Sequence, residues 1–183
     1  MNLLNEKQTE FAEKRLIATL DNYGWRLGTV FLSTPFILYV PEKIDVKYAY
    51  KLLENERMPG WLFMSKMNAN TIWESREGTQ AQSGIASPDH YSKGAVLEWL
   101  FSEMCGIKVT DENKFTIAPK IGGNFTFAKC EYESVYGKVF CGWQKEKGKT
   151  VYQIVIPANT TAMVIFPSSE KTLTAGKYEF TED

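Results

Sequence analysis

Two short motifs in this sequence carry side chains that could act on a ligand. Thr71-Ile72-Trp73-Glu74 places a carboxylate directly after a tryptophan, and Asp89-His90-Tyr91 holds the only histidine of the chain. A tryptophan wall raises the pKa of a neighbouring carboxyl by desolvation, whereas an adjacent arginine such as Arg76 lowers it by pairing. A neutral imidazole offers a ligand both a donor and an acceptor. The alternatives at this point are a solvated surface charge at Glu74 and a capping or core-edge histidine at His90.

Other side chains near these motifs fit the same kind of chemistry less directly. Glu77 and Asp89 are further carboxylates, and inverting hydrolysis of a glycoside needs an acid and a base with room for a water between them. Both also suit a helix cap or a surface charge. Trp61 follows Pro59 and Gly60 and can either stack on a sugar or pack in a core, whereas Trp99 has the spacing of a core residue.

Composition excludes several kinds of partner. Basic and acidic residues number 21 and 22, for a net charge of −1, so we expect no nucleic-acid partner and no attraction to an anionic membrane. The three cysteines form no CxxC pair, and with one histidine they predict no metal site; we also expect no cofactor. The longest apolar run, residues 30–40, is too short to span a bilayer, and the N-terminus lacks the apolar core of a signal peptide. We therefore expect a cytoplasmic protein, unless an upstream segment carries a targeting signal.

The first part of the chain has helical periodicity. We expect four helices, over residues 6–22, 29–40, 45–55 and 88–105. Asp45 is the expected N-cap of the third helix, and Ser87 with Pro88 is expected to begin the fourth. The second and fourth helices are apolar on most sides, which predicts burial on more than one face. About thirty residues before the fourth helix lack periodicity, and long irregular segments within a domain are usually functional. Glu74 lies in that segment.

After Gly106 the periodicity changes to two. Alternating segments separated by turn residues predict strands at 113–119, 125–134, 138–144, 150–157, 161–167 and 177–183. Six or seven such strands indicate an antiparallel β-sandwich. The sequence therefore predicts an α+β chain of two parts, a helical domain over residues 1–106 and a β-sandwich over residues 107–183.

Six blocks in order along the chain share the pattern of one family. They are LGTVFLSTPFIL, YAYKLLENERMPGWLF, NTIWESREG, SPDHYSKGAVLEWLFSEMCGI, FTIAPKIGGNFTFAKCEYESVYGKV and IPANTTAMVIFP. Together they resemble the C-terminal portion of bacterial α-L-rhamnosidases, glycoside hydrolase family 78. The resemblance covers nearly the whole chain. It implies the end of a six-hairpin α/α barrel followed by a C-terminal β-sandwich, and hydrolysis of terminal α-linked rhamnose with inversion.

The resemblance also implies roles for particular residues. Glu74, in the Thr-x-Trp-Glu motif, corresponds to the general base, and His90 to a histidine that binds the sugar ring; Trp73 and Trp61 are candidate substrate-binding neighbours. The family's general acid lies in an earlier segment, and neither Glu77 nor Asp89 matches it. Asp89 also stands where the family usually has asparagine.

These roles predict how the chain acts. We expect it to supply the base and a sugar ligand for a rhamnose-containing glycoside, and to be inactive alone. Another chain would then supply the missing barrel helices. The alternative is a non-catalytic carbohydrate-binding or structural module.

Overall fold

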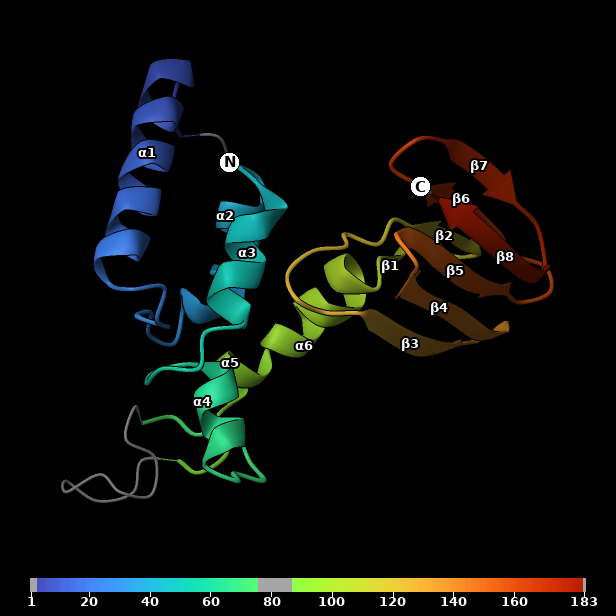
Figure 1. The fold of residues 1–183 in the computed structure, drawn as a ribbon. Coiled ribbons are helices and arrows are strands. Elements are labelled where there is room, and N and C mark those ends of the chain that lie inside the picture. The colour runs from blue at the N-terminus through green and yellow to red at the C-terminus, as the bar shows by residue number, and fades with distance from the viewer. Residues whose placement is uncertain (1–2, 76–86, 183) are drawn as a thin grey trace. The chain divides into compact units, whose positions relative to one another are not determined.

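The computed structural model describes residues 3–75 and 87–182. Contacts between Cα atoms divide the chain into two units, Met1–Val96 and Leu97–Asp183, and each is described by itself (Figure 1). This division falls within the last helical segment, before the domain boundary predicted at Gly106. The predicted combination of a helical part and a β-sandwich is confirmed.

Short helices make up the first unit. In its described residues they are α1 (Glu6–Asn22), α2 (Tyr39–Glu42), α3 (Val46–Leu53), α4 (Trp61–Lys66) and α5 (Tyr91–Gly94), and α6 (Val96–Trp99) begins at its end. Helix α1 has the predicted bounds and begins with a capping box, in which Asn5 and Gln8 each bond the other's backbone N–H. None of the helices in the described ranges is long and apolar enough to cross a membrane.

The continuous buried helix predicted over residues 29–40 is wrong. The segment forms turns, a 3-10 helix at Thr34–Phe36 and the first turn of α2. The Thr34 hydroxyl bonds the carbonyl oxygen of Val30, and the Thr29 and Thr34 hydroxyls lie 2.9 Å apart. Such local side-chain bonds compete with a helix, and Pro35 cannot donate a backbone hydrogen bond. Leu32 is 83% exposed, so this segment is also less buried than predicted.

Helix α3 is confirmed, with its predicted cap. The Asp45 carboxylate accepts from the backbone N–H of Lys47 at 2.9 Å, and the face that carries Tyr50 and Leu53 is buried. Helix α4 was not predicted, because a six-residue helix is too short to show periodicity.

The predicted start of the last helical segment is also wrong. His90, not Ser87, is the N-cap of α5, and Pro88 lies outside the helix. The Ser87 hydroxyl donates instead to the carbonyl oxygen of Asp89. The segment continues as α6 and ends in a π-helix at Leu100–Met104. Leu97 is 57% exposed, so burial on most sides is not observed.

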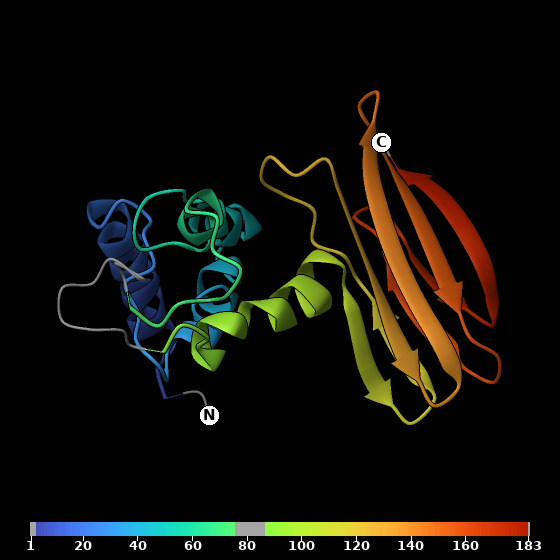
Figure 2. The ribbon, with the colours of Figure 1, turned by 90° about the horizontal axis from the view of Figure 1, so that it is seen from below.

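Eight strands form the second unit in its described residues. They are β1 (Ile107–Asp111), β2 (Lys114–Ile117), β3 (Phe127–Ser134), β4 (Gly137–Glu146), β5 (Lys149–Ile156), β6 (Thr161–Ile165), β7 (Glu170–Leu173) and β8 (Gly176–Glu182). One sheet has the order β1-β2-β6-β7 and the other β3-β4-β5-β8 (Figure 2). Strands β1 and β7 were not predicted. The predicted antiparallel β-sandwich is confirmed with one exception, because β2 pairs with β6 in parallel.

The core of this unit lies between the two sheets. Phe115, Ile117 and Val164 of one sheet and Val139 and Ile154 of the other are each at most 2% exposed. This alternation of buried and exposed residues is what the period-two pattern predicted.

Candidate active site

Two chain segments pair to form the candidate site. The backbone N–H of Glu74 donates to the carbonyl oxygen of Ser87 at 3.0 Å, and the N–H of His90 donates to that of Ile72 at 2.7 Å. The N–H of Ser87 returns a 2.8 Å bond to Oε2 of Glu74. The backbone therefore brings Glu74 and His90 close together and orients the Glu74 carboxylate.

Helix α5 supports this pairing from one side. Nζ of Lys93, whose side chain is buried, donates to the backbone carbonyl oxygen of Glu74 at 2.7 Å. The indole N–H of Trp61, in α4, donates to the carbonyl oxygen of Lys93 at 2.9 Å. Trp73 is also buried, and its backbone N–H points to Sδ of Met64, in α4, at 3.4 Å. A chain of contacts thus runs from α4 through α5 to the backbone of Glu74.

The tautomer of the neutral His90 ring follows from its hydrogen bonds. Nδ1 lies 3.3 Å from the backbone nitrogen of Ser92 and 3.1 Å from its hydroxyl oxygen. A backbone N–H can only donate, so Nδ1 accepts, and in the neutral ring the proton sits on Nε2. Phe31 and Tyr91 flank the imidazole, with ring centroids 4.7 Å and 5.3 Å away. Nε2–H is therefore the group through which His90 can donate to a ligand.

A depression of about 290 Å³ joins these groups within the first unit. Its polar lining comes from Glu74, Ser75, His90, Ser92 and Lys93, and the rest of the lining from Leu27, Thr29, Val30, Phe31 and Thr34. A carboxylate, an imidazole donor, an ammonium group and hydroxyls around one aromatic ring suit a compound that carries several hydroxyl groups. The carboxylate can also accept a proton from a bound water.

Of the four predicted site residues, Glu74 and His90 line this depression, and Trp73 and Trp61 are not among its lining residues. Both tryptophans are buried, 7% and 9% exposed, and the Trp61 indole N–H is committed to a backbone carbonyl. Asp89 is exposed, and Glu77 lies outside the described residues.

Sequence reasoning missed Lys93 and Phe31. Phe31 belonged to a run that was interpreted as a buried helix. Lys93 lies within the helix predicted over residues 88–105. A lysine in such an apolar run is itself a signal, because lysines are rarely fully buried without a partner.

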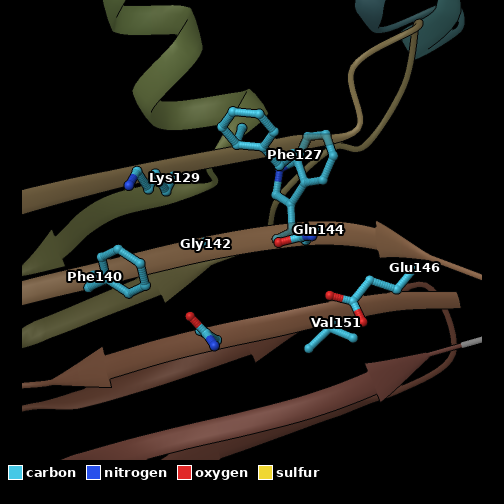
Figure 3. A pocket seen from close by; sticks show the side chains of 10 residues that line it. Phe127, Lys129, Phe140, Gly142, Gln144, Glu146 and Val151 are labelled. Carbon is cyan, nitrogen blue, oxygen red and sulfur yellow. The ribbon is translucent and has the colours of Figure 1, made fainter.

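A second depression, of about 110 Å³, lies on the sheet β3-β4-β5 (Figure 3). Gly142 stands between Lys129 of β3 and Gln153 of β5 in the strand register, so the middle of this face lacks a side chain. The Phe140 ring lies close to Gly142: a Cβ added at Gly142 would be 3.0 Å from that ring. Gln144 adds an amide to the lining. The aromatic ring of Phe140 can pack against a sugar ring, and the Gln144 amide can bond its hydroxyls, so this shallow depression suits a sugar.

Family models match most of the chain. The bacterial α-L-rhamnosidase six-hairpin glycosidase domain matches residues 1–104, and the bacterial α-L-rhamnosidase C-terminal domain matches residues 113–181. The α-L-rhamnosidase of Streptomyces avermitilis is 32% identical over 176 residues, which are 92% of this chain and 17% of that protein. The α-L-rhamnosidase of Formosa agariphila is 30% identical over 175 residues, 91% of this chain and 19% of that protein.

Solved structures agree with these matches. The Streptomyces avermitilis α-L-rhamnosidase complexed with L-rhamnose superposes with a TM-score of 0.87 at 28% identity, over 100% of this chain and 20% of that one. The native α-L-rhamnosidase of Aspergillus terreus superposes with a TM-score of 0.87 at 25% identity, over 97% of this chain and 22% of that one. This chain thus spans about a fifth of the relatives that it matches. It belongs to the bacterial α-L-rhamnosidase family, and it corresponds to a C-terminal fragment of the family's proteins.

Proposed function

We propose that this chain forms the C-terminal part of an inverting α-L-rhamnosidase, with Glu74 as the general base and His90 as a ligand of the sugar ring. The observation that carries the proposal is that the Glu74 carboxylate and the His90 imidazole line one depression on two paired segments. The relatives' names give the substrate class, an α-L-rhamnoside.

The proposed reaction places a water between Glu74 and the anomeric carbon of the sugar. Glu74 takes a proton from this water as the water oxygen bonds to the anomeric carbon, and the bond from that carbon to the leaving oxygen breaks. A separate carboxylic acid protonates the leaving oxygen. The Ser87 N–H holds Oε2 of Glu74 at 2.8 Å, which leaves the other carboxylate oxygen to accept the proton. Nε2–H of His90 would donate to a sugar hydroxyl.

The general acid is not assigned to this chain. We propose that it comes from the rest of the barrel, supplied by further sequence or by another chain, and that residues 1–183 alone are inactive. The helical unit supports this proposal, because Phe11, Val30, Leu32 and Phe36 are 61–83% exposed. Several large apolar side chains exposed on one unit are usually covered by a partner. The remaining helices of the barrel are the expected cover.

A chimera tests the assignment of the base. The matched C-terminal region of the Streptomyces avermitilis enzyme is replaced by this chain, and hydrolysis of p-nitrophenyl α-L-rhamnoside is followed. We expect activity in the chimera, and a decrease in kcat of about 10²–10⁴-fold in its Glu74→Gln variant. Glu112→Gln, which removes an exposed carboxylate from the β1–β2 turn, is the matched control and should keep full activity.

Each outcome of this test separates the parts of the proposal. Rhamnose release by the isolated 183-residue chain would contradict its inactivity. Full activity of the Glu74→Gln chimera would remove Glu74 from the role of base. If the chimera folds but hydrolyses no rhamnoside, the site of this chain does not complete a rhamnosidase.

The second depression favours a second candidate function, carbohydrate binding without chemistry. We propose that a sugar ring sits over Gly142 against Phe140, with the Gln144 amide bonded to its hydroxyls. Calorimetric titration of the whole chain with rhamnosides tests this binding. Gly142→Ala should abolish it by filling the floor, whereas Gly148→Ala, in a turn with open space around it, should not. Binding that survives Gly142→Ala would place the sugar elsewhere.

A further inference from the structure

The three cysteines converge on one region of the second unit. Cys130 of β3 and Cys141 of β4 are direct partners across the antiparallel pair, so their side chains share a face. Trp143 lies on the same face, two residues beyond Cys141, and its indole N–H donates to the carbonyl oxygen of Met104 at 2.8 Å. This bond fixes the residue before Cys105 against the sheet. The strand pairing and this bond together place Cys105 near the other two cysteines.

The side chains agree with this placement. The thiol of Cys130 is hydrogen-bonded to the sulfur of Cys105, which lowers the pKa of Cys105 and raises that of Cys130. Cys105 accordingly has the more acidic thiol and Cys130 is the donor. Cys141 is fully buried, and burial raises the pKa of its thiol. The pair therefore combines a sulfur whose pKa is lowered with a second thiol hydrogen-bonded to it.

The pair borders a groove, although Cys105 itself is only 4% exposed. Cys105 and Cys130 both line a groove of about 720 Å³ that runs between the end of the helical segment and β3, with Leu100, Phe101 and Phe127 among its other lining residues. Cys130 is half-buried, whereas Cys141 is not among the residues that line the groove. A small oxidant that enters the groove meets Cys105 and Cys130.

From these contacts we propose that Cys105 and Cys130 form an oxidisable dithiol, which hydrogen peroxide converts to a disulfide within the β-sandwich unit. The Cys105 thiolate attacks one peroxide oxygen, so that an S–O bond forms, the O–O bond breaks and hydroxide leaves. Cys130 sulfur then attacks the sulfenic sulfur of Cys105, and the proton of Cys130 leaves with the hydroxyl group as water. The hydroxide takes up the proton that Cys105 released when it ionised. Two thiols and one hydrogen peroxide thus give one disulfide and two waters.

This disulfide would join two parts of the sandwich. Cys105 directly precedes the segment that enters β1, at the edge of one sheet, and Cys130 lies on β3, at the edge of the other. The bond would close the chain between residues 105 and 130 and so restrict the unfolded state. We expect oxidation to raise the melting temperature of the second unit by roughly 5–15 °C.

The test exposes the whole folded chain to hydrogen peroxide and counts thiols in denaturant. The reduced chain has three, and we expect one after oxidation, with an intact mass lower by two hydrogens. Peptide mapping should link Cys105 to Cys130. In Cys130→Ser the link should be absent, and dimedone should trap a sulfenic acid at Cys105. In the control Cys141→Ala the link should form as in the wild type.

Two results would overturn the proposal. One is a wild-type chain that keeps all three thiols while dimedone labels none of them. The other is a map that links Cys130 to Cys141, the neighbours across the strand pair. If Cys141→Ala does not fold, as judged by circular dichroism, the wild-type peptide map still distinguishes the two linkages.

Discussion

Nζ of Lys93 donates a 2.7 Å hydrogen bond to the backbone carbonyl oxygen of Glu74, which ties the segment that carries the candidate base to helix α5. Trp61 secures the other side of that lysine, through its bond to the Lys93 carbonyl oxygen. The position of the Glu74 backbone therefore depends on a buried ammonium group. Lys93 is a positioning residue in this arrangement.

Replacing Lys93 with methionine tests this tie. The Lys93→Met variant keeps the length of the side chain but leaves the Glu74 carbonyl oxygen without this donor, so we expect a loss of about 1–3 kcal/mol in the free energy of unfolding of the helical unit. Urea unfolding followed by tryptophan fluorescence measures it. Lys7→Met, on the exposed side of α1, should change stability by less than about 0.5 kcal/mol. Equal losses in both variants would contradict a specific tie.

The two nitrogens of His90 can be tested separately. His90→Asn keeps an N-cap acceptor for the Ser92 N–H but removes Nε2–H, whereas His90→Ala removes both. We expect near wild-type stability for asparagine and a loss of about 1 kcal/mol for alanine. In the active chimera both variants should weaken the interaction with the sugar by roughly tenfold or more, measured as a change in kcat/KM. Full kcat/KM in His90→Asn would show that the histidine only caps α5.

Gly106 and Gly148 form a matched pair for backbone strain. Both have positive φ, +78° and +85°, but a Cβ at Gly106 would lie 2.2 Å from the backbone nitrogen of Pro119, while one at Gly148 meets no described atom within 4 Å. We expect Gly148→Ala to cost about 1–2 kcal/mol, the penalty for a left-handed backbone. Gly106→Ala should cost more than about 4 kcal/mol or prevent folding of the second unit. Thermal unfolding of both variants measures the difference, and similar melting temperatures would contradict it.

We expect the second unit to lose stability in acid because of its buried carboxylate, Glu103. Burial raises the pKa of this carboxyl, but the hydrogen bonds and charges of Lys108 and Lys120, at 2.6 Å and 2.9 Å, outweigh burial and lower the pKa below its ordinary range. In the unfolded chain a glutamate has a pKa near 4.3. Because the pKa of Glu103 is lower in the folded chain, its ionised carboxylate stabilises the fold above that pH. This stabilisation is lost as the pH falls through the pKa of the folded state and the carboxylate becomes protonated.

The Glu103→Gln variant isolates this contribution. At pH 7 we expect it to cost roughly 3 kcal/mol, because two lysines lose their buried partner. The difference from wild type should shrink as the pH falls below about 4. Guanidinium unfolding at several pH values measures it, with Glu112→Gln as the control. A constant difference across that range would contradict the role of ionised Glu103.

Much of the fold followed from local patterns. Helix α1 and the cap of α3 were predictable because their signals lie within a few residues of one another, as in the pair Asn5 and Gln8. The strands from β3 to β6 followed from alternation. The segment 29–40 did not, because its composition looks like a buried helix, whereas Thr34 bonds the preceding turn.

The site was predictable only in part. Each of the motifs around Glu74 and His90 left a non-functional alternative open, and their roles came from the family resemblance and stay predictions. Lys93 and Phe31 reach the same depression from segments that only the fold brings together. The cap at His90 could not be separated from Ser87, since serine before proline is a stronger local signal than histidine.

The parallel pair β2–β6 has a consequence for synthesis on the ribosome. Strands β1 and β2 emerge as a hairpin whose inner partner, β6, is translated only after β3, β4 and β5. A chain cut after Ile156 would leave one sheet with two strands and the other without β8. Neither sheet is therefore a contiguous stretch of the gene, and nascent β1–β2 keeps one edge unpaired until β6 has been translated.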